Sequence, residues 1–441
     1  MHQIIQTFLF SSALLFSLNG LFAQSNPLLG YVEMTEVCLV IHTKDFQFQE
    51  NSNQMELEYW IETKPKEKIL LVSENIDKSR DNTYHFILKD LIPGTSYNYS
   101  YGPTITTVSK EVYSFKTQTL WQHRTEPPAF RVATGSCAYI NEKEYDRPGE
   151  PYGSDYFIFD TIVSKKPDMM LWLGDNIYLR EVDYMSESGI VHRYNHTRGT
   201  PELKKLLSYC PNYAIWDDHD FGPNDSNGSY SHKDLTLDAF RQYWGNPPFG
   251  IKGAEKAITT SFQFMDIDFF LLDNRSNRTS PDIVGVEKPT ILGEAQINWL
   301  VQALKFSQSP YKIVAMGGQF LNTEAKFENY AVYNEERTRI IKLIENNNIS
   351  GVVFLTGDRH CTELSELKLS NGKIIYDLTV SPLTSHSYDN TKEANTLRVE
   401  GTLVPKANFA TLDFSGTKKE RKLTVIVYDN KGAKLWSKEL E

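Results

Sequence analysis

The chain has 441 residues, of which 40% are hydrophobic and 12% aromatic, and this composition supports a large buried core and argues against disorder. At roughly 150 residues per domain, we expect two or three domains. The formal net charge of -10 argues against a nucleic-acid partner held by a diffuse basic surface, so an anionic substrate would need cations focused locally, from a metal or from arginine.

Residues 1–23 resemble a secretory signal peptide. An apolar stretch from Ile4 to Leu18 leads to Leu21-Phe22-Ala23, a cleavage site before Gln24. The alternative is a membrane anchor, but the stretch is short for a membrane span and no second apolar stretch follows in the sequence. We therefore expect an exported protein, periplasmic or extracellular, without a transmembrane segment. Its four scattered cysteines do not suggest a dense disulfide framework, and one of them could be a metal ligand.

Residues 26–122 predict a small β-sandwich of the immunoglobulin or fibronectin type III kind. The runs CLVIHT, YWIET, KILLVS and TYHFIL are short and rich in β-branched and aromatic residues. The segment LIPGTSYNYSYG, which starts at Leu91, resembles the turn and following strand of these folds, with Tyr97 as the corner tyrosine. Nothing in this segment suggests chemistry. Residues 121–128, with their prolines and mixed charge, indicate a linker to a second domain over residues 128–441.

From residue 128 on, strand-like and helix-like stretches alternate, which is typical of an α/β domain. We expect helices over residues 156–164, 203–210 and 293–306. We expect strands in RVATGSC, MMLWL, YAIW, FFLLDNR, YKIVAMGGQF and GVVFLTGDRH. Polar residues follow the apolar part of each strand. Since the strands of one sheet can bring their ends to one edge, we expect these residues to form one site there.

The segment LWLGDNIYL, residues 171–179, carries the first of these polar groups. Gly174 permits a tight turn where the strand stops, and Asp175 and Tyr178 follow it. Because an ionised carboxylate has about four lone-pair directions, Asp175 could bridge two cations. A phenolate from Tyr178 suits a hard, highly charged ion such as ferric iron. In isolation, an N-capping aspartate and a packed tyrosine explain this segment better, and only the other strand ends reverse that preference.

The other strand ends add further ligand-type residues. These are Cys137, Asp218 with His219, Asp358 and His360. A single such end is weak evidence, but a set of four or five is hard to explain as surface polarity. Thiolate, phenolate and carboxylate donors supply negative charge for a trivalent cation, and the oxygen-rich second set suits calcium or another hard divalent ion.

The ordered motifs GSC, GDNIY, WDDHD, LDNR, LGEAQINWL and GDRH resemble the alkaline phosphatase D (PhoD-type) family of metallophosphatases over about residues 130–385. The resemblance implies a four-layer α/β/β/α sandwich, preceded by the small β-sandwich, that holds a ferric ion (Fe3+) and calcium (Ca2+). The iron ligands that it implies are Cys137, Tyr178 and His360, with Asp175 as the bridge between the cations. The second-cation ligands that it implies are Asp218 and Asp358, with His219 beside the phosphate and Arg275 on the phosphate oxygens.

The sequence departs from the family pattern in two motifs. Asp220 stands where the family commonly has glutamate, and LDNR replaces LDTR, with Arg278 a little further along the chain. These differences concern substrate preference more than the metal site. We include Arg278 and Gln319 with Arg275 among the candidate substrate-binding residues.

Each candidate also has a plainer interpretation. Cys137 could be a small buried hydrophobe or half of a disulfide. His219 could be structural, and Arg275 could pair with a nearby carboxylate. Gln319 could simply cap a strand.

Together the motifs predict an enzyme, a phosphoric ester hydrolase of the alkaline phosphatase or phosphodiesterase type. Metal-bound hydroxide would attack a phosphomonoester or phosphodiester. Arg275 would neutralise the equatorial oxygens, and His219 would protonate the leaving alkoxide or bind the developing charge. The alternative is a secreted binding protein whose sandwich recognises a glycan or protein and whose metallophosphatase domain is vestigial. Retention of every expected charged ligand argues against that alternative.

Overall fold

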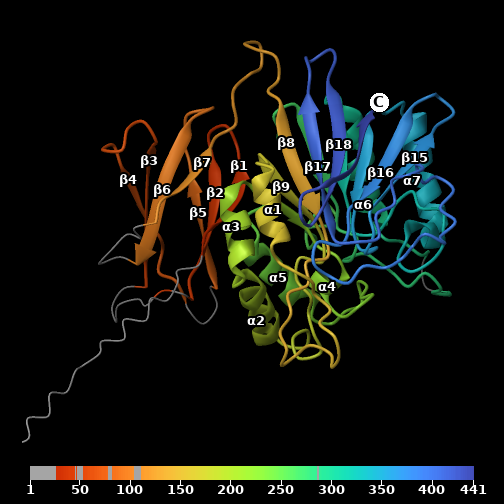
Figure 1. The fold of residues 1–441 in the computed structure, drawn as a ribbon, viewed down its shortest axis with the longest axis horizontal. Helices are drawn as coiled ribbons and strands as arrows, with labels where there is room; N and C mark the ends of the chain where they lie inside the picture. Colours follow the sequence, from red (N-terminus) through yellow and green to blue (C-terminus); the bar gives the residue numbers. More distant parts are fainter. Residues whose placement is uncertain (1–25, 45, 47–52, 78–81, 104–110, 286–287) are drawn as a thin grey trace, which may run out of the picture.

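The computed structural model describes residues 26–441 except 45, 47–52, 78–81, 104–110 and 286–287. The predicted signal peptide therefore lies outside the described residues. The first part of the chain forms two antiparallel sheets with the strand orders β1-β2-β5 and β4-β3-β6-β7 (Figure 1). Their strands are β1 (Leu28–Val32), β2 (Val37–His42), β3 (Met55–Ile61), β4 (Ile69–Val72), β5 (Thr83–Leu88), β6 (Ser96–Pro103) and β7 (Tyr113–Lys116).

The two N-terminal sheets enclose a core of their own. Alternate residues of β3, including Met55 and Leu57, are fully buried in it, because successive side chains of a strand point to opposite faces. Tyr97 lies near the start of β6, and its hydroxyl accepts a hydrogen bond of 2.9 Å from the amide of Ile92. This is the contact expected of a corner tyrosine.

The rest of the chain forms two six-stranded mixed sheets, with the orders β10-β9-β8-β17-β18-β19 and β11-β12-β13-β14-β16-β15. The first contains β8 (Phe130–Gly135), β9 (Met169–Leu173), β10 (Asn212–Ile215), β17 (Asn408–Ser415), β18 (Lys422–Asp429) and β19 (Lys434–Leu440). The second contains β11 (Thr260–Phe264), β12 (Ile267–Leu271), β13 (Lys312–Ala315), β14 (Val352–Thr356), β15 (Glu363–Lys368) and β16 (Ile374–Thr379). The strands β8, β9 and β10 are parallel, as are β12, β13, β14 and β16.

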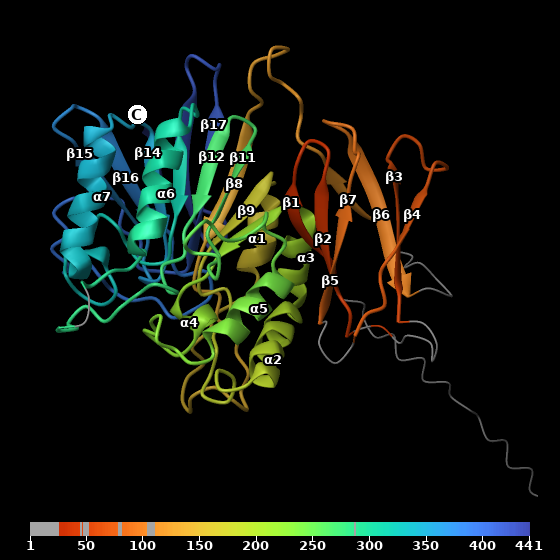
Figure 2. The same ribbon diagram turned by 180° about the vertical axis from the view of Figure 1, so that it is seen from behind.

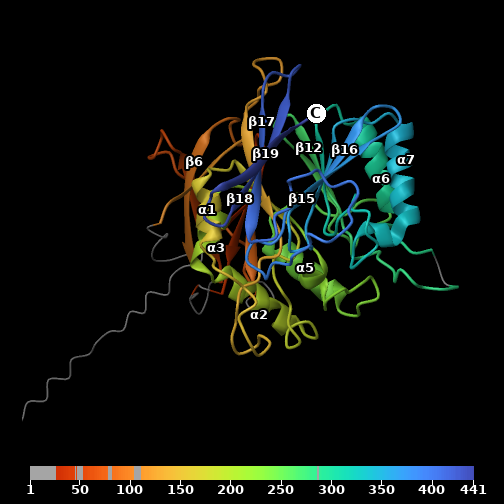
Figure 3. The ribbon, with the colours of Figure 1, turned by 45° about the vertical axis from the view of Figure 1, so that its right-hand side comes forward.

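The helices lie either along the outer faces of these two sheets or beyond the ends of their strands (Figures 2 and 3). They are α1 (Ile158–Ser164), α2 (Glu187–Arg198), α3 (Pro201–Tyr209), α4 (Asp218–Phe221), α5 (Lys233–Tyr243), α6 (Gly293–Phe306), α7 (Asn334–Asn346) and the 3-10 helix η1 (Tyr330–Tyr333). In the part of the chain that the structure describes, no helix is both long and apolar enough to cross a bilayer.

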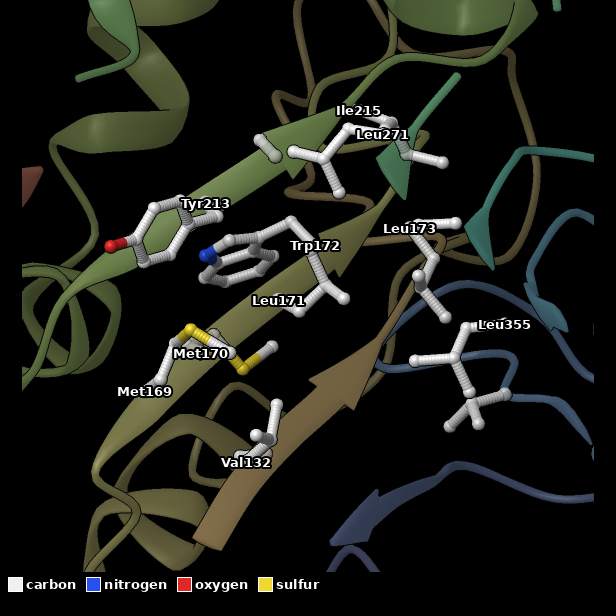
Figure 4. Close-up of a cluster of buried hydrophobic side chains, with 14 of the residues drawn as sticks. Val132, Met169, Met170, Leu171, Trp172, Leu173, Tyr213, Ile215, Leu271 and Leu355 are labelled. Carbon is white, nitrogen blue, oxygen red and sulfur yellow. The ribbon is translucent and has the colours of Figure 1, made fainter. Parts of the chain in front are cut away.

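The apolar residues of β12 show how the second sheet is covered on both faces. Phe269 and Leu271 belong to the large core shared with the first sheet, whereas Phe270 belongs to a separate core with residues of α6 and α7. Figure 4 shows Leu271 and Leu355 of the second sheet beside side chains of β9 and β10. Because both faces are covered, the central strands β13 and β14 are buried along their whole length rather than at alternate residues.

The predicted single sheet edge is wrong in one respect. Cys137, Asp175 and Asp218 follow β8, β9 and β10 of the first sheet, but Asp358 and His360 follow β14 of the second. An apolar run identifies a buried strand without indicating which sheet it joins. The two sheets face each other with the carboxyl ends of their parallel strands toward the same side, so the predicted residues still meet.

The N-terminal sheets rest directly on the second part of the chain. The amide of Tyr31 donates to the carbonyl of Gly245 at 2.7 Å, and the hydroxyl of Thr83 donates to the carbonyl of Gln242 at 2.6 Å. A Cβ atom on Gly30 would lie 2.6 Å from the Gly245 oxygen, so the close approach depends on glycine there. The sandwich is thus held against the end of α5.

Candidate metal centre

Backbone hydrogen bonds join the loops after β8 and β9, and the loop after β14 packs closely against both. The amide of Cys137 donates to the carbonyl of Gly174 at 3.2 Å, and the amide of Ala138 donates to the carbonyl of Asp175 at 2.8 Å. At Gly357, just before Asp358, a Cβ atom would lie 2.7 Å from both the Leu173 carbonyl and Ser136. The three strand ends are therefore in direct contact, which fixes where their side chains can meet.

Four of the predicted metal ligands have left-handed backbone conformations. Cys137, Asp175, Asp358 and His360 have φ values of 61°, 51°, 67° and 52°. Residues with side chains avoid this region, at a free-energy cost of about 1–3 kcal/mol each, and such residues cluster at active sites. Since four ligands share it, the local backbone is organised around the position of their side chains.

The predicted iron ligands converge on one another. The Cys137 Sγ atom lies 3.4 Å from Asp175 Oδ2, and the Tyr178 hydroxyl donates to the same oxygen at 3.2 Å. The Tyr178 hydroxyl is also 3.4 Å from His360 Nε2. Cys137, Asp175 and His360 each offer a ligand atom, and these three atoms all lie within 4.8 Å of one another. A single cation could contact all of them.

A second group of ligand atoms begins at the other side of Asp175. Asp175, Asp218 and His219 form one set within 4.8 Å, and Asp217, Asp218 and Asp358 form another. The amide of His219 donates to Asp175 Oδ1 at 3.3 Å. Asp175 therefore belongs to both groups, and Oδ2 faces the first while Oδ1 faces the second. This is the arrangement that a bridging carboxylate requires.

Two carboxylate oxygens in this second group have no hydrogen-bond partner. Asp217 Oδ2, Asp218 Oδ1 and His219 Nδ1 are buried and have no hydrogen-bond partner, although Arg275 lies 3.6 Å from Asp218 Oδ1 in an ion pair. Buried polar atoms are nearly always hydrogen-bonded, so these carboxylate oxygens require a further partner. A divalent cation satisfies that requirement with the hard oxygen ligands that it prefers. The donor set thus fits metal binding.

The electrostatics of the centre lead to the same conclusion. Burial and the neighbouring carboxylates of Asp218 and Asp217 raise the pKa of Asp175 well above its usual range. Burial, followed by Asp217, does the same to the pKa of Asp358. Burial also raises the pKa of the Cys137 thiol and of the Tyr178 phenol. Each anion is disfavoured by the protein alone and would be stabilised by a nearby cation.

Two groups of the second set show the opposite shift. Burial alone would raise the pKa of Asp218, but the charges of His219 and Arg275 outweigh it and lower the pKa to about 2. Burial lowers the pKa of His219 despite the attraction of Asp218. His219 Nε2 lies 3.9 Å from Asp218 Oδ2, and its side chain is 22% exposed. Among the candidate residues, His219 thus stands at the side of the centre that is open to solvent.

Arg275 is enclosed in ion pairs. The residue is 0% exposed, and it pairs with Asp217 and with Glu328, whose Oε1 accepts from Nη1 at 2.9 Å. Arg278 pairs with Glu328 as well, at 2.7 Å. These contacts favour the plainer interpretation of Arg275, that it pairs with carboxylates, and its contact with phosphate stays a prediction.

Gln319 is equally enclosed. Its side-chain nitrogen donates to Glu363 and to Thr379, both at 2.8 Å, and its oxygen accepts from Arg359 at 3.0 Å. The structure therefore places Gln319 in a buried polar network beside the GDRH loop rather than among the ligand atoms of the centre. Its role in substrate binding also remains a prediction.

Three residues outside the predicted set belong to the ligand groups: Asp217, Asp225 and Glu328. Asp217 stands in the WDDHD motif, and the Gly317-Gly318 pair was a usable signal in the sequence. A Cβ atom on Gly317 would lie 2.3 Å from Asp217 Cγ, so the paired glycines 317 and 318 mark a close approach. Glu328 lies in a loop without periodic pattern, and the sequence gives no signal for it.

Comparisons with known proteins identify the family to which the chain is similar. The family model described as PhoD-like phosphatase matches residues 133–422. Alkaline phosphatase D of Bacillus subtilis (strain 168) is 25% identical over 299 residues, covering 57% of this chain and 49% of that protein. The chain thus spans about half the length of this curated relative.

Two solved structures share the fold over most of the chain. The structure of PhoD superposes with a TM-score of 0.75 at 17% identity and covers 95% of this chain and 93% of that one. The purple acid phosphatase PPD1 from yellow lupin (Lupinus luteus) seeds superposes with a TM-score of 0.66 at 13% identity, covering 94% and 73%. At these identities the likeness concerns the fold alone.

Proposed function

Because the chain belongs to the PhoD-like phosphatase family, we propose that it is an exported, metal-dependent phosphoric ester hydrolase acting on a phosphomonoester or phosphodiester. The observation that carries this proposal is the position of Asp175, whose two oxygens face two separate groups of ligand atoms. A carboxylate shared in this way supports two cations side by side rather than one structural ion.

In this proposal the first group holds ferric iron and the second holds calcium or another hard divalent ion. Cys137, Tyr178 and His360 would hold the iron, Asp218 and Asp358 would hold the second cation, and Asp175 would serve both. When bound, the two cations would supply Lewis-acid polarisation of the phosphoryl oxygens and hydroxide near neutral pH.

The protein's own groups then orient the substrate and its leaving oxygen. His219 is the candidate for donating a hydrogen bond or a proton to that oxygen, because its side chain is 22% exposed while its ring is fixed. The amide of His219 is held by Asp175, and its ring packs on Tyr178 with 4.3 Å between centroids. Arg275 acts mainly by positioning Asp217 and Glu328 next to the second group.

We extend the proposal to the architecture. The order of packing, with helices outside each sheet and a shared core between the sheets, supports a four-layer α/β/β/α sandwich. The separate core of the first seven strands supports an immunoglobulin-like or fibronectin-like domain over residues 26–122, with the metallophosphatase domain over residues 128–441. Export through a cleaved leader is tested by sequencing the N-terminus of the mature protein. A start near Gln24 is expected, and an intact Met1 on cytoplasmic protein would contradict it.

Metal content and hydrolysis, measured together, test the function. Purified protein should contain stoichiometric iron and should hydrolyse p-nitrophenyl phosphate or its diester. Asp175→Ala should lose both metal and activity, whereas Asp234→Ala, which removes an exposed carboxylate paired with Lys256, should keep both. A binding protein with a vestigial domain would purify without stoichiometric iron. Full activity in Asp175→Ala would eliminate the two-cation proposal.

A further inference from the structure

The first candidate ligand group is bordered by aromatic rings that the proposed chemistry does not use. Tyr388 packs parallel to His360, with ring centroids 5.2 Å apart and planes 15° apart. His386 lies against Tyr388 at 5.3 Å and 69°, and Tyr152 lies 6.1 Å from His386. We define Tyr152, His386 and Tyr388 as the aromatic rim.

The position of Tyr388 is fixed by three separate contacts. Its amide donates to the carbonyl of His360 at 3.1 Å, its ring packs on the His360 ring, and its hydroxyl shares a hydrogen bond of 3.3 Å with the Tyr152 hydroxyl. The next part of the loop is held as well, because the Asn390 side chain donates to the Arg359 carbonyl at 3.1 Å. The ring is therefore ordered before any ligand arrives.

Despite these contacts, Tyr388 keeps 48% of its surface exposed, and His386 is exposed beside it. A tyrosine that serves only to pack on His360 would gain more by burying its ring. An ordered, half-exposed aromatic surface is well suited to binding another flat ring, because the entropy of holding its side chain is already lost in the free protein. Aromatic rings pack favourably in offset-stacked and edge-to-face arrangements.

We propose that the aromatic rim binds the organic group of the phosphate ester, and that the preferred substrates carry a flat aromatic ring near the phosphorus. This inference rests on the proposed function, since it places the phosphate at the ligand group that contains His360. From there, a ring on a phosphorus substituent is within reach of the Tyr388 ring that lies against His360. The chemical class is a phosphate ester with an aryl or nucleobase group, because both present an aromatic face.

Direct binding of phosphonates separates ring recognition from catalysis. Phenylphosphonate, cyclohexylphosphonate and methylphosphonate have a phosphorus–carbon bond that a phosphoesterase does not cleave, and at alkaline pH they carry the same charge. Titration calorimetry on the metal-loaded protein should show tighter binding of the phenyl compound than of the other two. Stacking of one aromatic ring on a side chain corresponds to roughly 5- to 150-fold in affinity.

Variants show whether the rim causes this preference. Tyr388→Ala should remove most of the phenyl-to-methyl ratio, whereas Tyr388→Phe, which keeps the ring, should retain it. Phe306→Ala is the matched control, because Phe306 is 85% exposed but lies at the end of α6, near the opposite ends of the strands. Partial loss of metal would weaken the binding of the phenyl and methyl compounds alike, so it would not change their affinity ratio. The metal content of each variant is measured as well.

Each outcome is decisive. If all three phosphonates bind equally, or if Tyr388→Ala leaves the phenyl-to-methyl ratio unchanged, the inference about the rim is wrong while the proposed function stands. If cyclohexylphosphonate binds as tightly as the phenyl compound, the rim recognises apolar bulk and not a flat ring, and the assigned substrate class is wrong. If no phosphonate binds to metal-loaded protein, the proposed function itself fails. Nucleoside phosphates against phenyl phosphate then distinguish nucleobase from simple aryl substrates.

Discussion

At the scale of single residues, left-handed backbone conformations and unfavourable buried charges occur at the same predicted ligands. Three of the four ligands in left-handed conformations, Cys137, Asp175 and Asp358, are also groups whose anionic forms the protein disfavours. Asp175, for example, is buried among four other aspartates, which raise its pKa in the protein alone. Both features cost stability and neither improves packing, so they indicate a site selected for cation binding rather than for folding.

His219 tests whether chemistry and metal binding can be separated. His219→Ala should keep most of its metal, because its partners Asp175 and Asp218 belong to further ligand groups. The rate should fall on the order of 10²–10⁴, the usual contribution of a proton-transfer group. Steady-state kinetics on a nitrophenyl and an alkyl ester provide the measurement. The loss should be smaller for nitrophenyl, whose leaving group needs less protonation, and equal losses would assign His219 to phosphate binding instead.

Visible absorption that depends on Tyr178 and Cys137 would identify the first cation. A tyrosinate or thiolate bound to ferric iron absorbs visible light by charge transfer, so the purified protein should be coloured. Tyr178→Phe and Cys137→Ser should each shift or bleach the band while far-UV circular dichroism stays unchanged. An unaltered spectrum in both variants would show that these residues are not the iron ligands.

The ion pairs of Arg275 predict a large effect on stability. Arg275→Ala leaves Asp217 without its counter-ion in the interior and leaves Glu328 paired with Arg278 alone, and removing one partner of a buried pair costs about 3–5 kcal/mol. Arg339→Ala is the control, because Arg339 pairs with Glu294 at the surface, where a pair contributes about 0–1 kcal/mol. Urea unfolding of the metal-free proteins compares the two. Similar midpoints for both variants would contradict the prediction.

Single residues were predictable where a strand ended in them. Cys137, Asp175, Asp218 and His360 each follow an apolar run, and the structure brings them together. Arg275 also follows such a run, but nothing in its neighbours in sequence revealed that Glu328, 53 positions away, would neutralise it. An ion pair between two loops depends on tertiary packing, and the local pattern carries no information about it.

At the scale of elements, the turn after β9 depends on one glycine. Gly174 has a φ of +93°, and a Cβ atom there would lie 2.7 Å from the Asp217 Cβ and 2.9 Å from its amide nitrogen. Gly174→Ala should therefore displace either the Asp175 loop or the Asp217 loop and reduce both stability and metal binding. Gly372→Ala is the control, since Gly372 has a φ of +82° with nothing within 4 Å.

The two alanine variants separate backbone strain from collision. Gly372→Ala should cost only the left-handed strain, about 1–2 kcal/mol, and should keep its metal. Gly174→Ala carries the same strain together with the contact to Asp217. Thermal unfolding and metal analysis provide the measurements, and equal effects of the two variants would show that the close approach at Gly174 is unimportant.

The elements themselves were predictable to different degrees. The helix over residues 293–306 begins and ends as predicted, because apolar residues recur in it at helical spacing. The strand β9 also has its predicted bounds, because it is an unbroken apolar run. The helices α2 and α7 were not predicted, since the charged residues of α7 and the polar sequence of α2 obscure their apolar faces. The antiparallel strands β17, β18 and β19 complete the first sheet from the end of the chain, a long-range pairing that no local pattern specifies.

At the scale of the whole molecule, the N-terminal sheets and the second part of the chain share part of one core. Leu28 and Val40 of the first strands belong to the same buried cluster as the β9 residues beneath the centre. The sequence predicted a division into domains, but it could not show that the domains contact each other. Residues such as Val40 look like ordinary strand residues until the surface that covers them is known.

One buried histidine in this contact makes it sensitive to acid. His42, at the end of β2, packs edge-on against Tyr243 of α5 at 5.5 Å. Burial, together with the positive charges of Arg198, Lys204 and Lys44, lowers its pKa to about 3. These basic groups come from α2, α3 and the loop after β2. Each of them repels the protonated His42 ring.

The sign of the effect on stability follows from proton binding. Above pH 6.5, the ordinary pKa of histidine, His42 is neutral in both the folded and the unfolded chain and contributes no pH dependence. As the pH falls from 6.5 toward 3, the unfolded chain binds a proton that the folded chain excludes, so folded stability is lost progressively. One pKa unit corresponds to 1.36 kcal/mol, and the loss reaches roughly 4 kcal/mol at the lower end.

His42→Phe keeps a ring against Tyr243 but removes the titrating group. Its urea midpoint should decline less steeply between pH 6.5 and 4 than that of the parent protein, and the two slopes should agree above pH 7. Comparing slopes removes the carboxylates that titrate in the same range, since they are common to both proteins. Parallel curves over the whole range would show that acid does not act through His42. A flatter curve for the variant would show that protonation of His42 contributes to the loss of stability in acid.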